Sequence, residues 1–195
     1  MRANTRGRTF TESARRAQIV AAAIAVIAEH GYAAASFTRI AKHAGLSSTG
    51  MISYHFANKD DLIREVLIET TTVAADYMRP RMDAATGYAA KLRARLESNM
   101  ELVRAHPDHV RALIEIALNA PKTPDFVDER FTLFATHLRE GQQAGEFGPF
   151  HPEAMAVAII GAIDATVRGL ITFPDLDATQ FGRELADTFE RATRP

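Results

Sequence analysis

The sequence of 195 residues contains no cysteine and no tryptophan. The absence of cysteine excludes disulfide frameworks, thiolate metal sites and cysteine nucleophiles, and it fits a reducing cytoplasm. Long hydrophobic runs are also missing, because the two longest, residues 19–28 and 154–163, are ten residues each, whereas a membrane-spanning helix needs about 20. We therefore predict a cytoplasmic protein without a membrane span.

Strand patterns are absent as well, since no stretch of β-branched and aromatic residues alternates with period two between turn residues. Apolar residues instead recur every three or four positions, and residues typical of helix starts and ends separate these stretches. The sequence predicts an all-α protein of about nine helices. Their expected ranges are 10–30, 37–43, 48–56, 59–79, 88–105, 107–119, 125–143, 152–172 and 177–193.

Motifs for catalysis are not found. None of the seven histidines follows a glutamate by three residues, and the HExxH, GxSxG and GxGxxG patterns do not occur. His106 and His109 could ligate a metal, but Pro107 places them at a helix start, where surface histidines are ordinary. We predict no catalytic residue, no metal site and no cofactor. A helical-bundle enzyme, or a metal- or ligand-binding protein without a DNA function, is the alternative.

The net charge of −1 is the sum of two unlike parts of the chain. Residues 1–59 carry eight lysines and arginines but only two acids, Glu12 and Glu29, whereas the remaining 136 residues carry 15 basic and 22 acidic side chains. A cationic end on an otherwise anionic protein predicts contact with a polyanion. A basic leader with Arg15 and Arg16 before an apolar stretch also resembles an export signal, but the bulky residues after it keep helical spacing.

Residues 36–56 have the pattern of a helix-turn-helix. Two helices that meet at a steep angle need a small residue at the crossing and a residue with positive φ at the turn, and Ala41 and Gly45 supply them. Ser36 and Ser47 can cap the two helices. The apolar residues expected to pin both helices against the first helix are Ile40, Leu46 and Met51. An ordinary helical hairpin would also need a glycine turn, but the cationic charge argues against it.

Four segments of this region form a recognisable set. They are Glu29-His30-Gly31-Tyr32, Phe37-Thr38-Arg39-Ile40-Ala41, Ala44-Gly45-Leu46-Ser47 and Tyr54-His55-Phe56-Ala57-Asn58-Lys59-Asp60-Asp61-Leu62. Together they resemble the TetR-type family of bacterial transcriptional regulators, although the stretch between Gly45 and Phe56 is one residue longer than the commonest family pattern. The resemblance implies a homodimeric repressor that binds double-stranded DNA and is released by a small apolar or amphipathic ligand.

Twelve residues in this region are predicted to contact DNA. The hydroxyls of Ser36 and Ser47, with the backbone N–H groups at the helix starts, can hold phosphates. Arg39 is the best candidate for a bidentate guanine contact, or it could reach a phosphate. By the resemblance, Lys59 contacts a phosphate, with a solvated lysine as the alternative. The set is Ser36, Thr38, Arg39, Lys42, Ser47, Ser48, Thr49, Gly50, Ser53, Tyr54, His55 and Lys59.

The expected division of the chain is a DNA-binding domain over residues 1–58 and an effector-binding and dimerisation domain over residues 59–195. A basic arm of Arg2, Arg6 and Arg8 could follow the DNA backbone or an adjacent minor groove, or stay solvated. The resemblance implies an effector pocket among the middle helices, although methionine and phenylalanine at helical spacing also predict an ordinary core. The pocket candidates are Met78, Asn99, Met100, Leu113, Ile116, Phe131, Phe134 and His137.

The last two helices are the predicted dimer interface. The near-absence of charge between Glu153 and Asp164 requires burial on more than one side, which a four-helix seam between two subunits provides. The family dimerises in this way. A two-fold dimer places two recognition helices about 34 Å apart, so the operator should be palindromic. The interface candidates are Met155, Ile159, Ile163, Val167, Phe181, Leu185 and Phe189.

Overall fold

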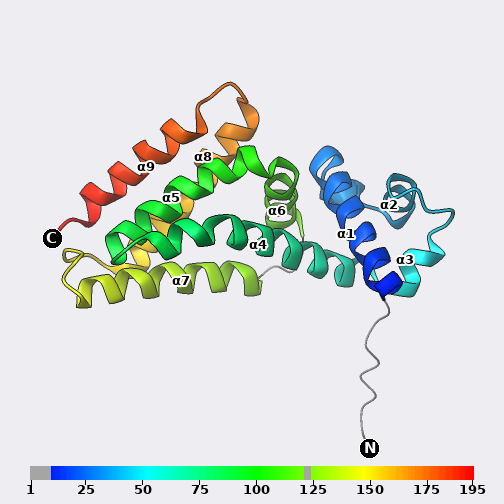
Figure 1. Ribbon diagram of the computed structural model, residues 1–195, viewed down its shortest axis with the longest axis horizontal. Helices are drawn as coiled ribbons and strands as arrows, with labels where there is room; N and C mark the ends of the chain where they lie inside the picture. The colour runs from blue at the N-terminus through cyan, green and yellow to red at the C-terminus, as the bar shows by residue number, and fades with distance from the viewer. Residues whose placement is uncertain (1–9, 121–123) are drawn as a thin grey trace, which may run out of the picture. The chain divides into compact units, whose positions relative to one another are not determined.

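The computed structural model describes residues 10–120 and 124–195, so the basic arm of Arg2, Arg6 and Arg8 lies outside the described residues. Within these ranges the chain forms nine α-helices, one 3₁₀ turn and no strand (Figure 1), which confirms the predicted all-α fold. The elements are α1 (Phe10–His30), η1 (Tyr32–Ala34), α2 (Phe37–His43), α3 (Gly50–His55), α4 (Lys59–Ala84), α5 (Tyr88–Ala105), α6 (Pro107–Asn119), α7 (Pro124–Gln143), α8 (Pro152–Thr172) and α9 (Ala178–Thr193).

Two helix ends differ from the predicted ranges by two residues or more, and three others differ by one residue. α3 begins at Gly50, and Thr49 stands at its N-cap without a side-chain hydrogen bond. Ser47 lies in the preceding turn, so the prediction that it caps this helix is wrong. α4 continues past Pro80 to Ala84. A proline inside a helix leaves one backbone carbonyl without its hydrogen bond, and the free energy lost is smallest where water can bond to that carbonyl. Pro80 is exposed, so α4 can continue past it.

The chain divides into two compact units. The first comprises Met1–Thr71 with Arg111–Ala120, and the second comprises Thr72–Val110 with Pro121–Pro195. α4 and α6 therefore contribute residues to both units. The domain boundary between residues 58 and 59 stays a prediction, and the compact units divide the chain later, inside α4.

α1 supplies the centre of the first unit's core. Its residues Ile19, Ala23, Val26 and Ile27 are fully buried and recur at three- and four-residue spacing, so they form one apolar face of the helix. Packed with them are Ile40 and Ala41 from α2, Ile52 from α3, Phe56, Leu62 and Val66 from the α3–α4 region, and Ala112 and Ile116 from α6. The second half of α6 is thus a core element of this unit.

α5 is the central helix of the second unit. It packs most extensively against α9, and also against α8 and α7 (Figure 1). Gly182 of α9 lies so close to α5 that a Cβ atom there would stand 3.1 Å from the Cα of Glu97. Glycine at this position lets the two helices approach closely. The buried apolar residues of α5 are Leu92, Leu96, Met100, Leu102 and Val103.

α8 is unusually apolar. Among the described residues it is the one helix long and apolar enough to cross a membrane by length and composition, a test that the core helices of folded domains also pass. One side of α8 packs against α7 and α5, and Asp164 near its middle forms an ion pair of 2.7 Å with Arg130 of α7. Another side remains uncovered in the single chain, where Val157 is 61% exposed.

Candidate nucleic-acid interface

The connection between α2 and α3 has the geometry of a helix-turn-helix. Ser36 caps α2, since its side chain accepts a hydrogen bond of 3.3 Å from the N–H of Arg39. Gly45 has φ +67° at the turn, and the N–H of Leu46 returns to the carbonyl of Ala41 at 2.9 Å. Ala41 is buried in the core of the first unit. The predicted cap of α2 and the predicted turn residue are confirmed, whereas the role of Ala41 at the crossing of the two helices stays a prediction.

The register of α3 differs from the prediction for one residue. Ile52 and Phe56 are fully buried and hold α3 against the core, whereas Met51 is 44% exposed. The assignment of Met51 to the core is therefore wrong. On a helix, residues three apart share a face, and Met51 shares its exposed face with Tyr54, which is 71% exposed.

The twelve residues predicted to contact DNA lie on the surface of the first unit. Thr49, His55 and Lys59 are half-buried, and the other nine are exposed. Tyr54 donates a hydrogen bond of 3.3 Å to Glu12 of α1, and its ring meets His55 edge-on at 5.0 Å between centroids. The exposed nine are Ser36, Thr38, Arg39, Lys42, Ser47, Ser48, Gly50, Ser53 and Tyr54.

Lys59 is held at the start of α4. Its ammonium donates a hydrogen bond of 3.0 Å to the carbonyl of Tyr32 and lies 4.2 Å from the centroid of that ring. Partial burial lowers the pKa of Lys59, while Asp60 opposes the shift. A lysine ammonium has three donors, so two remain for other acceptors. The N–H of Tyr32 in turn donates to the carboxylate of Glu115 on α6 at 3.3 Å.

A reciprocal cap fixes where α4 begins. The side chain of Asn58 accepts a hydrogen bond of 2.8 Å from the N–H of Asp61, and the Asp61 carboxylate accepts one of 3.1 Å from the N–H of Ala57. This arrangement satisfies two backbone donors that a helix start leaves open. The sequence prediction noted the acids at this helix start but not the Asn58 cap, which its spacing to Asp61 could have indicated.

Arg16 is the residue of this unit that the sequence prediction missed. It is buried on α1, and its guanidinium donates a hydrogen bond of 2.6 Å to the carbonyl of His55, the last residue of α3. The same group forms an ion pair of 2.6 Å with Glu65 of α4 and lies 4.1 Å from the centroid of the Phe56 ring. Its position three residues before Ile19, on the apolar face of α1, is the signal that could have identified it.

Some of the predicted effector residues lie along the interior of the second unit. Asn99 of α5 contacts the sulfur of Met78 on α4 at 3.5 Å. Phe134 of α7 is buried, and Phe131 beside it is half-buried. His137, one turn further along α7, is 2.9 Å from the carbonyl of Tyr88 through Nε2. Burial is the main cause that lowers the pKa of His137, and Arg95 adds to it.

The other three predicted effector residues lie elsewhere. Met100 is fully buried and lies next to Gly182 of α9. A Cβ atom added to Gly182 would stand 3.4 Å from the Cβ of Met100. Ile116 is fully buried in the core of the first unit, and Leu113 belongs to the same unit. The eight residues therefore do not gather into one site, because periodicity identifies buried positions without telling which neighbour covers them.

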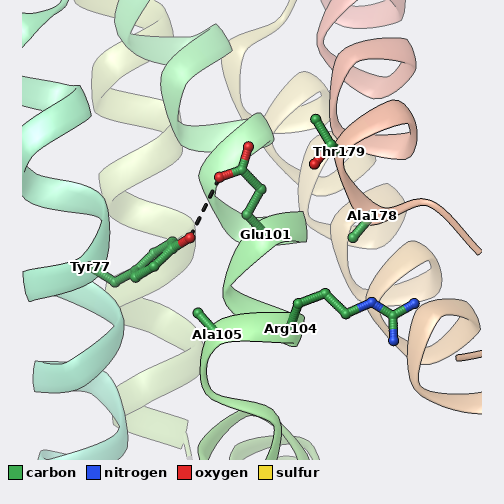
Figure 2. Close-up of a pocket in the computed structure, with 6 residues that line it drawn as sticks. All are labelled: Tyr77, Glu101, Arg104, Ala105, Ala178 and Thr179. Atoms are coloured by element: carbon green, nitrogen blue, oxygen red, sulfur yellow. Dashed lines mark hydrogen bonds between the residues drawn. The ribbon is translucent and has the colours of Figure 1, made fainter.

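A hollow of about 440 Å³ opens on the second unit (Figure 2). Figure 2 shows Tyr77 and Glu101 turned toward each other, with their oxygens 3.5 Å apart. Glu101 also pairs with Arg81 at 2.5 Å, and Arg104 donates to the carbonyl of Leu176 at 2.7 Å. The side chains of Tyr77, Glu101 and Arg104 are therefore each bonded within the protein. The lining residues are Tyr77, Glu101, Arg104, Ala105, Ala178 and Thr179, and no predicted effector residue is among them.

The seven residues predicted for the dimer interface do not form one exposed surface. Four are buried inside the chain's own bundle, which makes them core residues: Ile159, Ile163, Val167 and Phe189. Met155 and Leu185 are half-buried, and Phe181 is 40% exposed. The exposed side of α8 instead carries small and apolar residues, namely Ala154, Val157, Ala158, Gly161 and Ala165. The surface open to a partner is therefore rotated from the predicted one.

Metal ligands do not gather in the part of the chain that the structure describes, where no three histidine or acidic side chains could hold one ion. His106 and His109 contact each other edge-on at 5.7 Å between ring centroids, and the Tyr77 ring meets His106 at the same distance. These rings form an aromatic cluster at the start of α6.

Comparison with known proteins gives consistent relatives. A family model described as bacterial regulatory proteins of the tetR family matches residues 19–66, which span most of α1 to the first two turns of α4. HTH-type transcriptional regulator BetI 2 of Chromohalobacter salexigens is 28% identical over 186 residues, covering 91% of this chain and 87% of that protein.

Two solved structures extend the likeness over the fold. The fatty acid degradation regulator FadR from Bacillus halodurans has a TM-score of 0.78 at 25% identity, covering 91% of this chain and 99% of that chain. The transcriptional regulator FadR from Bacillus subtilis, in complex with stearoyl-CoA, has a TM-score of 0.75 at 22% identity, covering 88% of this chain and 95% of that chain. The second structure is similar in fold alone.

Proposed function

The chain belongs to the TetR family of bacterial transcriptional regulators, and from that premise we propose that it is a cytoplasmic, homodimeric repressor of a palindromic operator. It is a DNA-binding regulator and not an enzyme. The observation that carries the proposal is the surface of α2 and α3. There the residues expected to read DNA are accessible while Ile52 and Phe56 anchor the helix from behind.

In the proposed complex, α3 enters the major groove. Ser53, Tyr54 and Met51 are the exposed side chains of α3 that can reach base edges, and Met51 offers an apolar contact for a thymine methyl group. Arg39 and Lys42, exposed on α2, supply contacts to guanine or to flanking phosphates. Lys59 can contact a phosphate with the donors that Tyr32 does not use.

The remaining proposed backbone contacts come from the loop and the helix starts. Hydroxyls that can bond to phosphate are carried by Ser36, Thr38, Ser47, Ser48 and Thr49. Gly50 has no side chain, so the DNA backbone can approach the start of α3 closely. His55 completes the proposed set beside Tyr54.

The proposed dimer uses the uncovered side of α8 with Phe181 of α9. Val157 and Phe181 are large apolar residues left 61% and 40% exposed by the single chain. The small residues around Val157 would let the α8 helices of two subunits approach closely, and a two-fold axis would present the two α3 helices to successive turns of a duplex. The predicted residues Met155 and Leu185 would lie at the edge of this surface.

The proposed effector is a small apolar or amphipathic molecule bound among α4, α5, α7 and α8. FadR from Bacillus subtilis, which shares the fold, was solved with stearoyl-CoA, and this supports a bundle of this kind as a ligand site. A ligand that binds one conformation better than the other shifts the population toward it. In the proposal the favoured conformation is the one that does not bind the operator.

The test uses the purified full-length chain and DNA from upstream of its own gene. We expect protection of a palindrome in a footprint, with an affinity that falls steeply as salt rises because phosphate contacts release counterions. Val157→Asp should yield a monomer by light scattering and lose operator binding, whereas Ile68→Asp on α4, at a residue 53% exposed, is the control and should stay a dimer. Equal affinity for the palindrome and for random DNA would refute sequence-specific recognition.

A further inference from the structure

Arg95 on α5 is half-buried and lies against α7 in the second unit. The carbon of its guanidinium lies 5.1 Å from the centroid of the Phe134 ring on α7. Phe134 is only 3% exposed, so a cation stacked on this ring stands on the inner side of the α5–α7 contact. Cation–π attraction stabilises such a placement, but it does not supply a counter-charge.

Two arginines on the same helix have opposite surroundings. Arg93 forms ion pairs with three carboxylates, at 3.0 Å with Glu97 and at 2.5 Å with both Asp187 and Glu190. For Arg95, none of the described residues provides an ion pair or a hydrogen bond to the guanidinium. A structural arginine normally has acidic partners, as Arg93 does, because a desolvated cation is costly without them.

The charge around Arg95 is positive. Arg130 stands one turn before Phe134 on the same face of α7, and its carboxylate partner Asp164 on α8 is bonded to it at 2.7 Å. Burial lowers the pKa of Arg95, and Arg130 lowers it further. His137 is also on this face, and burial is the main cause that lowers its pKa. Among the residues that the structure describes, two guanidinium groups thus face one carboxylate.

Polar and apolar side chains lie near Arg95. Asn99 lies one turn after Arg95 on α5, donates to the Arg95 carbonyl at 2.8 Å and contacts the sulfur of Met78. Methionine side chains repack around ligands of different shape, and Phe134 offers an aromatic surface. An anion bound to Arg95 would have its apolar body against these residues.

We propose that Arg95 binds the acidic group of the effector, which is an amphipathic anion with an apolar body and a carboxylate or phosphate head. This inference rests on the proposed ligand-responsive function and specifies the charge of the ligand. The planar guanidinium suits either oxyanion because it can donate two parallel hydrogen bonds. The bound anion supplies the counter-charge that none of the described residues gives to Arg95.

The test measures binding to the purified protein by calorimetry and thermal shift at pH 7.5. The probes are octanoate, dodecanoate and hexadecanoate, each with its matching alcohol and alkyltrimethylammonium ion, and hexadecanoyl-CoA as the phosphate-bearing probe. We expect at least one acid or the thioester to bind about tenfold or more tightly than its matched alcohol, since a charge-assisted hydrogen bond inside a protein is worth such a factor. The ammonium probes should bind most weakly.

Three variants assign the effect to Arg95. Arg95→Met keeps most of the packing on Phe134 and should reduce the preference for the acid to less than about threefold while the alcohol still binds; Arg95→Lys should keep part of it. Arg79→Met removes an exposed guanidinium from α4 and should change nothing. Selectivity for the anion that survives in Arg95→Met, alcohols or ammonium ions that bind as well as the anionic probes, or no binding of any acid or of the thioester would each overturn the proposal. Operator binding and dimerisation, measured on the same samples, report separately on the proposed function.

Discussion

Replacing Arg16 tests whether one buried side chain positions the recognition helix. Arg16 joins three elements, because it bonds to the carbonyl of His55 at the end of α3, pairs with Glu65 of α4 and lies on the ring of Phe56. Arg16→Met keeps an apolar side chain of similar length over Phe56 and removes the charge and the donors. We expect it to loosen the end of α3 without unfolding the protein.

The magnitude follows from the contacts. A hydrogen bond from a charged donor is worth about 1.5–3 kcal/mol. The Glu65 side chain is 35% exposed, so its ion pair is partly screened by water and adds at most about 1 kcal/mol. The Nε of Arg16 is buried without a hydrogen-bond partner among the described residues, and removing this unsatisfied donor returns about 1 kcal/mol. The free energy of unfolding should fall by about 2 kcal/mol, which leaves a domain of ordinary stability folded.

The assay compares specific with non-specific DNA binding. The His55 carbonyl belongs to the last turn of α3, so we expect Arg16→Met to weaken operator binding about tenfold while affinity for random DNA changes less than about twofold. Arg15→Met is the matched control. Among the described residues, the side chain of Arg15 bonds only to Gln18 of its own helix, at 2.6 Å. Urea unfolding gives the stability of each variant. If Arg16→Met bound operator as Arg15→Met does, or weakened both DNA affinities equally, its assignment as a positioning residue would be wrong.

Three further changes test other contacts. Lys59→Ala should weaken binding to all DNA sequences alike and reduce the salt dependence by about one phosphate contact, measured by titration at several salt concentrations. Gly45→Ala meets open space but must adopt φ +67°, so it should cost about 1 kcal/mol and lower the Tm by roughly 2–4 °C in a thermal melt. Arg93 holds the pKa values of Asp187 and Glu190 below their usual range. A carboxylate whose pKa is lower in the folded than in the unfolded protein stabilises the fold at pH values above its unfolded-state pKa. This stabilisation is lost as the pH falls through its folded-state pKa. Arg93→Met should therefore flatten the decline of Tm below about pH 4, and an unchanged decline would refute this.

Helix positions were predictable because their signals are local. The cap of Ser36, the glycine turn at Gly45 and the apolar spacing of α1 each act within one or two turns of chain. The start of α3 was not predictable in this way, since no side chain caps it and packing sets its first turn. The same packing selects Ile52 over Met51 for the core. The extra residue before Phe56 was visible in the sequence, but its effect on the register depends on contacts with α1 and α4.

The site was predictable where exposure alone decides it. A polar residue on the outer side of a short helix is accessible whatever the rest of the chain does, so the predicted DNA-facing residues of α2 and α3 are at the surface. The role of Arg16 depends on three distant partners, so its place on the apolar face of α1 indicates burial but not which groups it contacts. Between Glu153 and Asp164, α8 carries no charged residue on any side, so periodicity could not tell Ile159, which faces the chain's own core, from Val157, which is exposed.

Counting charges along the chain identified the cationic end, but it could not show which charges are neutralised by partners. Arg93 and Arg95 are two residues apart and contribute equally to that count. In the fold, Arg93 pairs with three carboxylates, two from α9 and one from its own helix. Arg95 is stacked on a buried phenylalanine. A half-buried charge with no partner among the described residues is a more specific indication of a ligand than the overall charge of the domain, because the domain as a whole is anionic and would repel an acid in solution. Acid selectivity in this bundle must therefore arise at Arg95 and not from the surrounding field, so raising the salt should leave the preference of the protein for acid over alcohol nearly unchanged.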